Sequence, residues 1–121
     1  MATIKSYTDL QQSKKLAEVL PIESADMCYT LLYTGASLTG QSKYNDFPCV
    51  LPSFAHGSSA IPCWSLAALL GVLPKGTNIS TPKPINELGY CCWNQYDEIY
   101  ANNPIDACYE MIIKLNKLNL L

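Results

Sequence analysis

Near the start of the chain, apolar residues recur every three or four positions and charged residues occupy the positions between them. This spacing is typical of a helix with one buried face. Thr8 or Ser6 is placed to cap the start of the helix, and Pro21 to end it. The pattern predicts a first helix over residues 8–20.

The same spacing returns more clearly near the end of the chain. Asn103 is a good N-cap residue, Pro104 suits the first helical position, and Asp106 lies where a capping-box acid would lie. Glu110 and Lys114 are spaced i, i+4 on the side predicted to face water. The predicted buried stripe consists of Cys108, Met111, Ile112, Leu115 and Leu118.

Residues 61–71 contain almost no polar side chain. Pro62 stands where a proline costs little at the start of a helix, and leucine and alanine follow it. A helix without a polar face is expected to be buried on several sides. The pattern therefore predicts a second helix over 61–71 at the centre of the core.

Shorter runs rich in β-forming residues predict strands over 27–33, 88–95 and 98–101, with a further short strand at 49–51. The last two of the main runs are joined by a turn near Tyr96 and predict a hairpin. Successive strand residues point to opposite faces, so Cys91 and Cys92 are not expected to act as adjacent ligands of one metal ion.

Together these elements predict an α+β fold, with three helices packed on a small antiparallel sheet of three to four strands. The length of 121 residues suits a single domain over 1–121. Residues 34–60 are dense in glycine, serine, asparagine and proline, and are expected to form a variable loop region.

Composition limits the function classes. The chain is 49% hydrophobic and only 15% charged, which favours a folded core. All eight basic residues are lysines, they are scattered, and the net charge is -2. Without arginine forks or a basic stripe, nucleic-acid binding is not expected. No glycine-rich phosphate motif is present, so no cofactor is expected.

The first residues lack the pattern of a signal peptide, and no apolar stretch reaches the roughly 20 residues of a membrane span. No association with a membrane is therefore expected. Six cysteines in a chain of this kind are expected to be reduced thiols, and the expected location is the cytoplasm.

Thiol catalysis is one alternative. Cys63 lies in the first turn of the predicted second helix, whose dipole would favour a thiolate, and His56 lies seven residues upstream as a potential base. No catalytic motif surrounds either residue, so we favour a small buried hydrophobe at Cys63 and a loop residue at His56. The cysteine spacings also lack the paired knuckles of structural zinc sites, and no metal site is expected.

Aromatic residues are numerous, with eight tyrosines and two tryptophans. Such side chains are enriched at protein interfaces, and they also fill the cores of small domains. Both uses remain open for the aromatic residues on predicted strands. The candidate interaction surface consists of Tyr29, Tyr33, Tyr90, Trp93 and Tyr100.

Residues 61–70 and 103–111, together with the opening helix around residues 12–16, resemble small uncharacterised proteins of gut Bacteroidetes and their phages, prophages or other mobile elements. The resemblance covers about half of the chain and falls mostly on helix positions. It implies a shared fold, a bacterial cytoplasmic setting and an accessory role in phage or host biology. In that pattern a small residue is expected where Cys63 stands.

The leading hypothesis from the sequence is a non-enzymatic module that binds a protein partner of unknown identity. It would act through the aromatic surface or through the loop at 34–59. The alternatives are a small enzyme that uses the Cys63 thiolate, and a homo-oligomeric structural protein closed by an edge strand or an aromatic patch.

Overall fold

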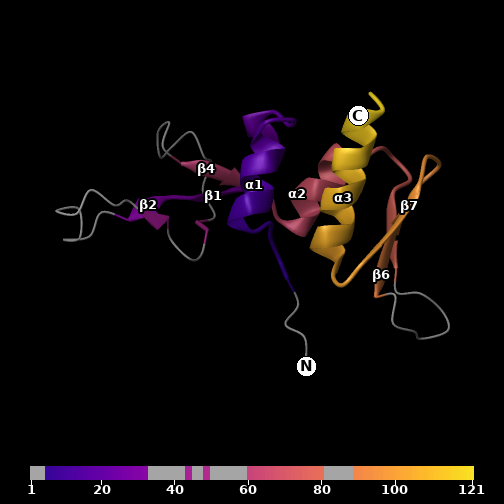
Figure 1. Ribbon diagram of the computed structural model, residues 1–121, viewed down its shortest axis with the longest axis horizontal. Coiled ribbons are helices and arrows are strands. Elements are labelled where there is room, and N and C mark those ends of the chain that lie inside the picture. Colours follow the sequence, from indigo (N-terminus) through magenta and orange to yellow (C-terminus); the bar gives the residue numbers. More distant parts are fainter. Residues whose placement is uncertain (1–4, 33–42, 45–47, 50–59, 81–88) are drawn as a thin grey trace. The chain divides into compact units, whose positions relative to one another are not determined.

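The computed structural model describes residues 5–32, 43–44, 48–49, 60–80 and 89–121 (Figure 1). These residues form three α-helices and small antiparallel sheets, one of them three-stranded, which confirms the predicted α+β fold. The chain divides into two compact units. The N-terminal unit is residues 9–64, and the C-terminal unit is residues 65–121 together with residues 1–8.

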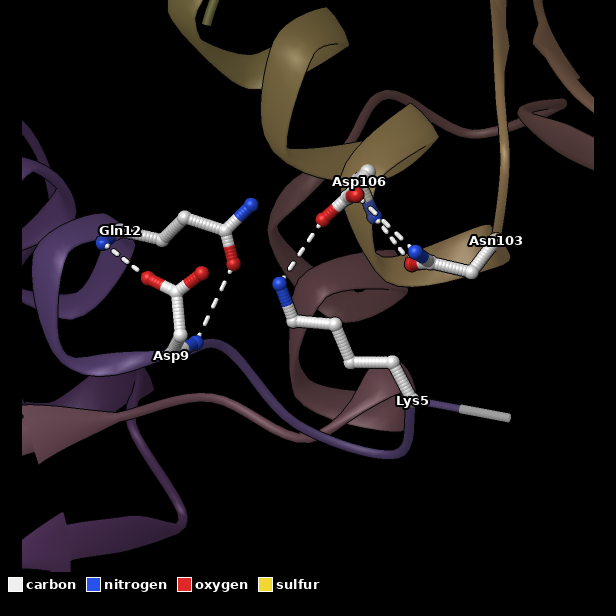
Figure 2. Close-up of polar contacts among 5 residues, drawn as sticks. All are labelled: Lys5, Asp9, Gln12, Asn103 and Asp106. Atoms are coloured by element: carbon white, nitrogen blue, oxygen red, sulfur yellow. Dashed lines mark hydrogen bonds and ion pairs between the residues drawn. The ribbon is translucent and has the colours of Figure 1, made fainter. Parts of the chain in front are cut away.

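The first helix of the N-terminal unit, α1 (Leu10–Ala17), is capped by Asp9 and not by Thr8 or Ser6. The Asp9 carboxylate accepts from the Gln12 backbone N–H at 2.8 Å, and Gln12 Oε1 accepts from the Asp9 N–H at 3.1 Å (Figure 2). This reciprocal pair satisfies two backbone donors at once, which a lone Thr8 hydroxyl would not do. The predicted N-cap was therefore wrong, and the actual N-cap, Asp9, is the residue that follows Thr8.

The strands of the N-terminal unit are short. After a 3-10 turn, η1 (Ile22–Ser24), β1 (Met27–Tyr29) pairs antiparallel with β4 (Ile61–Cys63). β2 (Leu31–Leu32) pairs with β3 (Lys43–Tyr44) in a separate sheet. The single strand predicted over 27–33 is thus broken into two, and each part has its own partner.

The short strand predicted at 49–51 lies mostly outside the described residues. Cys49 is described, and it forms an isolated antiparallel bridge with Cys28. The Cys28 N–H donates to the Cys49 carbonyl at 2.9 Å, and the Cys49 N–H donates to the Cys28 carbonyl at 2.7 Å. The rest of the loop region predicted at 34–60 is described only at β3, Pro48 and residue 60.

The helix predicted over 61–71 is wrong in its first half. Residues 61–63 form β4, and the helix α2 (Leu66–Val72) begins only after Ser65, whose hydroxyl accepts from the Ala68 N–H at 3.2 Å. Trp64 lies between them, fully buried in the N-terminal unit, and its Nε1 donates to Ser24 Oγ at 3.0 Å. Only Leu69 of α2 is buried, so this helix is not the centre of the core.

The C-terminal unit contains a three-stranded antiparallel sheet in the order β5-β6-β7: β5 (Asn78–Ser80), β6 (Tyr90–Trp93) and β7 (Glu98–Ala101). The hairpin β6-β7 confirms the prediction. The sequence pattern missed β5, because this three-residue strand lies in a proline-rich region that was expected to be a loop. Figure 1 shows α3 (Pro104–Lys117) running beside β6 and β7.

Helix α3 is the best predicted element. Asn103 caps it: the Asp106 N–H donates to Asn103 Oδ1 at 2.8 Å, and Asn103 Nδ2 donates back to Asp106 Oδ2 at 2.9 Å. Lys5 Nζ lies 2.9 Å from Asp106 Oδ1 and ties the N-terminal segment to this cap (Figure 2). Leu118, predicted to be buried, is 54% exposed because the helix ends at Lys117. The rest of the predicted stripe is fully buried: Cys108, Met111, Ile112 and Leu115.

Within the part of the chain that the structure describes, no helix has both the length and the apolar character needed to cross a membrane.

Candidate functional site

The sheet of the C-terminal unit has two different faces. Residues directly opposite each other on neighbouring strands share a face, and successive residues alternate. The face toward α3 carries Ile79, Cys92 and Ile99 in one row across the three strands. The opposite face, here called the outer face, carries two rows: Ser80, Cys91 and Tyr100, and Asn78, Trp93 and Glu98.

Two of the predicted interaction residues come together on the outer face. Trp93 is 43% exposed and Tyr100 is 41% exposed, and they come from adjacent strands. Tyr96, in the turn between these strands, is also exposed. Tyr96 was predicted only as a turn residue, not as a surface aromatic residue.

The other three predicted interaction residues lie elsewhere. Tyr29 is only 3% exposed, in the core of the N-terminal unit, so its assignment to a surface is wrong. Tyr90 shares the α3-facing side of the sheet with Cys92 and is half-buried. Tyr33 lies outside the described residues. Of the five predicted residues, Trp93 and Tyr100 are thus the two that the structure places exposed together on one face.

The Tyr100 hydroxyl is held as a hydrogen-bond donor. It donates to Glu98 Oε1 at 2.8 Å along the same strand. This bond to a carboxylate, together with loss of solvent, raises the pKa of Tyr100 to about 12. Beside it, burial raises the pKa of the Cys91 thiol, so neither group is arranged to act as a base or nucleophile near neutral pH.

A hollow of about 520 Å³ lies between β7 and the side of α3 that faces away from the buried stripe. Ile99 of β7 forms one wall. The other walls come from α3 and its C-cap residue, and they combine apolar and charged side chains. The residues contributed by α3 and its C-cap are Tyr109, Glu110, Ile113, Lys114, Lys117 and Leu118. We call this hollow the α3-β7 groove.

The charges of the groove differ from the predicted arrangement. Lys114 forms an ion pair with the Asp97 carboxylate at the hairpin turn, in place of the predicted pair with Glu110. Asp97 also accepts from the Glu98 N–H at 2.7 Å. Among the described residues, Glu110 and Lys117 form no ion pair. They stand two helical turns apart, roughly 10 Å, and are the charges of the groove lining that form no ion pair within the part of the chain that the structure describes.

We expect Asp97→Asn to destabilise the C-terminal unit near neutral pH and to have a smaller effect in acid. The hydrogen bond from Lys114 lowers the pKa of Asp97 in the folded state. A lowered folded-state pKa gives stability that is present above the unfolded-state value, near 4, and is lost as the pH falls through the folded-state value. The check is urea unfolding of both proteins between about pH 7 and about pH 2.

Glu110→Gln is the matched control for that substitution, because it also removes one carboxylate charge, and among the described residues Glu110 forms no ion pair. Its effect on stability is expected to be smaller at every pH. An Asp97→Asn effect that does not change with pH would contradict a stabilising ion pair with Lys114.

All six cysteines are free thiols. Cys63 lies in β4 and is fully buried, so the expectation that it occupies the first turn of a helix is wrong, and no helix dipole acts on it from that position. His56 lies outside the described residues. No group of three or more metal-ligating side chains suited to an ion occurs within the described ranges.

Two thiols meet in the core of the C-terminal unit. Cys108 of α3 donates a hydrogen bond to Cys92 of β6, and this bond together with burial raises the pKa of Cys108. Both side chains are fully buried. A protonated, solvent-free thiol packs as a small apolar group, so this pair serves helix-sheet packing.

The groove itself was missed from the sequence, although a signal was present. Tyr109 and Ile113 lie on the side of α3 opposite the predicted buried stripe, beside Glu110 and Lys114. Apolar residues on the wet side of an amphipathic helix indicate a second contact surface. Their association with Ile99 could not be predicted without the packing of α3 on the hairpin.

Comparison of the chain with protein-family models, with curated proteins and with solved structures finds no match.

Proposed function

We propose that this protein is a non-enzymatic protein-interaction module, and that its C-terminal unit binds a polypeptide segment of a partner in the α3-β7 groove. The observation that carries the proposal is the groove itself: about 520 Å³ of space with an apolar lining, open beside an edge strand. Sites of this size with a few placed charges are typical of ligand recognition. The exposed Trp93 and Tyr100 on the same hairpin add aromatic contact area for a larger partner.

The unpaired charges define the chemistry of the partner segment. An apolar side chain would fill the space between Ile99 and Ile113. An acidic side chain would lie toward Lys117, and a basic one toward Glu110. Exposed ion pairs contribute little affinity each, so apolar burial supplies the energy and the charges supply orientation.

A reducing, cytoplasmic setting fits this proposal, because all six cysteines are free thiols. The absence of arginine and the net charge of -2 argue for a protein partner over nucleic acid. The resemblance to small proteins of gut Bacteroidetes and their phages supports an accessory role, in which a small module acts by binding and not by catalysis.

The test is selection of a random peptide library on the immobilised full chain, followed by fluorescence polarisation with the enriched peptides. Leu118→Asp places a charge in the groove at a residue that is already exposed, so folding is expected to be unaffected. We expect it to weaken binding at least tenfold. Lys75→Glu, an exposed lysine away from the groove, is expected to leave binding unchanged.

Two results would overturn this function. One is the enrichment of no peptide that binds the protein in solution. The other is equal binding by the wild type and by Leu118→Asp, which would move the contact away from the groove.

A further inference from the structure

We propose that the partner segment binds the C-terminal unit as an extended strand, paired antiparallel with the open edge of β7, with alternate side chains in the α3-β7 groove. This inference rests on the proposed function and deepens it, because it names the conformation and the side-chain order of the bound segment. It follows from the hydrogen-bond alternation of the hairpin, the position of the groove and the direction of α3.

β7 is an edge strand, since the sheet order is β5-β6-β7 among the described strands. The Asn94 N–H donates to the Asp97 carbonyl at 3.0 Å, so these two residues form a hydrogen-bonded pair of the hairpin. Hydrogen-bonded and non-hydrogen-bonded pairs alternate along an antiparallel ladder. The next hydrogen-bonded pairs are therefore Cys92 with Ile99, and Tyr90 with Ala101.

The residues between these pairs direct their backbone groups away from β6. They are Glu98 and Tyr100. The Glu98 N–H is already taken by the Asp97 carboxylate at 2.7 Å. The N–H and C=O of Tyr100 and the C=O of Glu98 remain at the edge, and these are the groups that an added strand would pair with.

The groove lies where alternate side chains of such a strand would fall. Ile99 is on the α3-facing side of the sheet and also forms a wall of the groove. A residue of the added strand opposite Ile99 shares its face, and so do the residues two before and two after it. The first and last of these three residues lie roughly 13 Å apart along the strand. Glu110 and Lys117 lie roughly 10 Å apart along α3, and their long side chains cover the difference.

The direction of α3 sets the order of the three side chains. Two residues separate the end of β7 from the start of α3, which returns along the strand, and the ion pair from Lys114 to Asp97 lies at the turn end of the hairpin. A strand antiparallel to β7 therefore runs in the direction of α3. From its N-terminus it would place a basic residue near Glu110, an apolar residue at Ile99, and an acidic residue near Lys117. The ion pair with Lys114 neutralises the Asp97 carboxylate, which reduces its repulsion of the acidic residue of the partner segment.

The probe is a nine-residue peptide of threonine, with lysine, leucine and glutamate at its third, fifth and seventh positions. The control peptide has lysine and glutamate exchanged. Binding is followed by amide shifts of the ¹⁵N-labelled full chain, which report weak binding. We expect the probe to bind about fivefold more tightly than the control and to shift the Tyr100 amide.

Backbone methylation separates strand addition from other modes. In the bound strand, the threonine N–H groups beside the leucine point to β7, and the leucine N–H points away. N-methylation of those threonines is expected to weaken binding at least tenfold, and N-methylation of the leucine to leave it nearly unchanged. Equal effects of the two methylations would overturn strand addition, while binding that still depends on Leu118 would leave the proposed function standing.

A charge exchange on the protein tests the order. Glu110 and Lys117 are both exposed, so the double variant Glu110→Lys, Lys117→Glu is expected to fold normally and to prefer the control peptide over the probe by the same factor. An unchanged preference would overturn the assigned direction. Sedimentation of the protein alone across a dilution series gives a further outcome: a dimer lost in Leu118→Asp would show that a second copy occupies this edge, and would overturn a foreign partner.

Discussion

Replacement of Trp64 by alanine is expected to lower the free energy of unfolding of the N-terminal unit by about 3–5 kcal/mol. Trp64 is the largest fully buried side chain of the described residues. Its removal leaves a cavity and also deletes the hydrogen bond from its Nε1 to Ser24 Oγ. Urea unfolding followed by far-UV circular dichroism measures the change.

Trp93 provides the matched control, because the chain has two tryptophans and Trp93 is half-exposed on the outer face. Trp93→Ala is expected to change stability by about 1 kcal/mol or less. Similar losses for the two substitutions would contradict the assignment of Trp64 to the core.

Leu115→Ala is expected to destabilise the C-terminal unit by about 2–5 kcal/mol, and Leu118→Ala by about 0.5 kcal/mol or less. Both leucines belong to the stripe predicted from helical spacing. In the structure Leu115 is fully buried, and Leu118 is exposed just beyond the end of α3. The two substitutions remove the same atoms three residues apart, so their difference measures burial alone.

The measurement is again urea unfolding, with the slope of the free energy against denaturant compared between variants. A large effect of Leu118→Ala on stability would indicate that Leu118 is covered in solution. A small effect of Leu115→Ala would contradict the packing of α3 against the sheet.

The contrast between these two leucines shows which features of α3 the apolar spacing could predict. The cap of α3 and the buried positions through Leu115 could be predicted, because Asn103, Pro104 and the apolar spacing are local signals that agree. The spacing alone does not say where the helix stops. The error at Leu118 arises because no glycine or proline marks the helix end.

The helix predicted over residues 61–71 was partly wrong for a different reason. A short apolar run is compatible with a strand or a buried helix, and only its pairing partner decides between them. Here β1 pairs with residues 61–63, and the helix capped by the Ser65 hydroxyl starts at Leu66, five residues later than predicted. Pro62 is tolerated in β4 because a two-stranded sheet has only edge strands.

The position of Trp93 and Tyr100 on predicted strands made them candidates for an aromatic surface, with burial in the core as the other use left open. In the structure both are exposed on one face of the sheet. The same pattern could not show that Tyr29 is buried in the other unit, because burial depends on what covers a strand. The groove was missed because Ile99 and Ile113 come from different elements.

The sequence by itself determined the α+β class, the hairpin of the C-terminal unit and the capped final helix, because each depends on signals within a few residues of one another. The tertiary structure alone decided the strand at 61–63, the partner of Lys114, and the groove beside β7. Each of these joins residues distant along the chain, and contacts of that kind are selected by shape and burial across the whole unit, which local spacing does not encode.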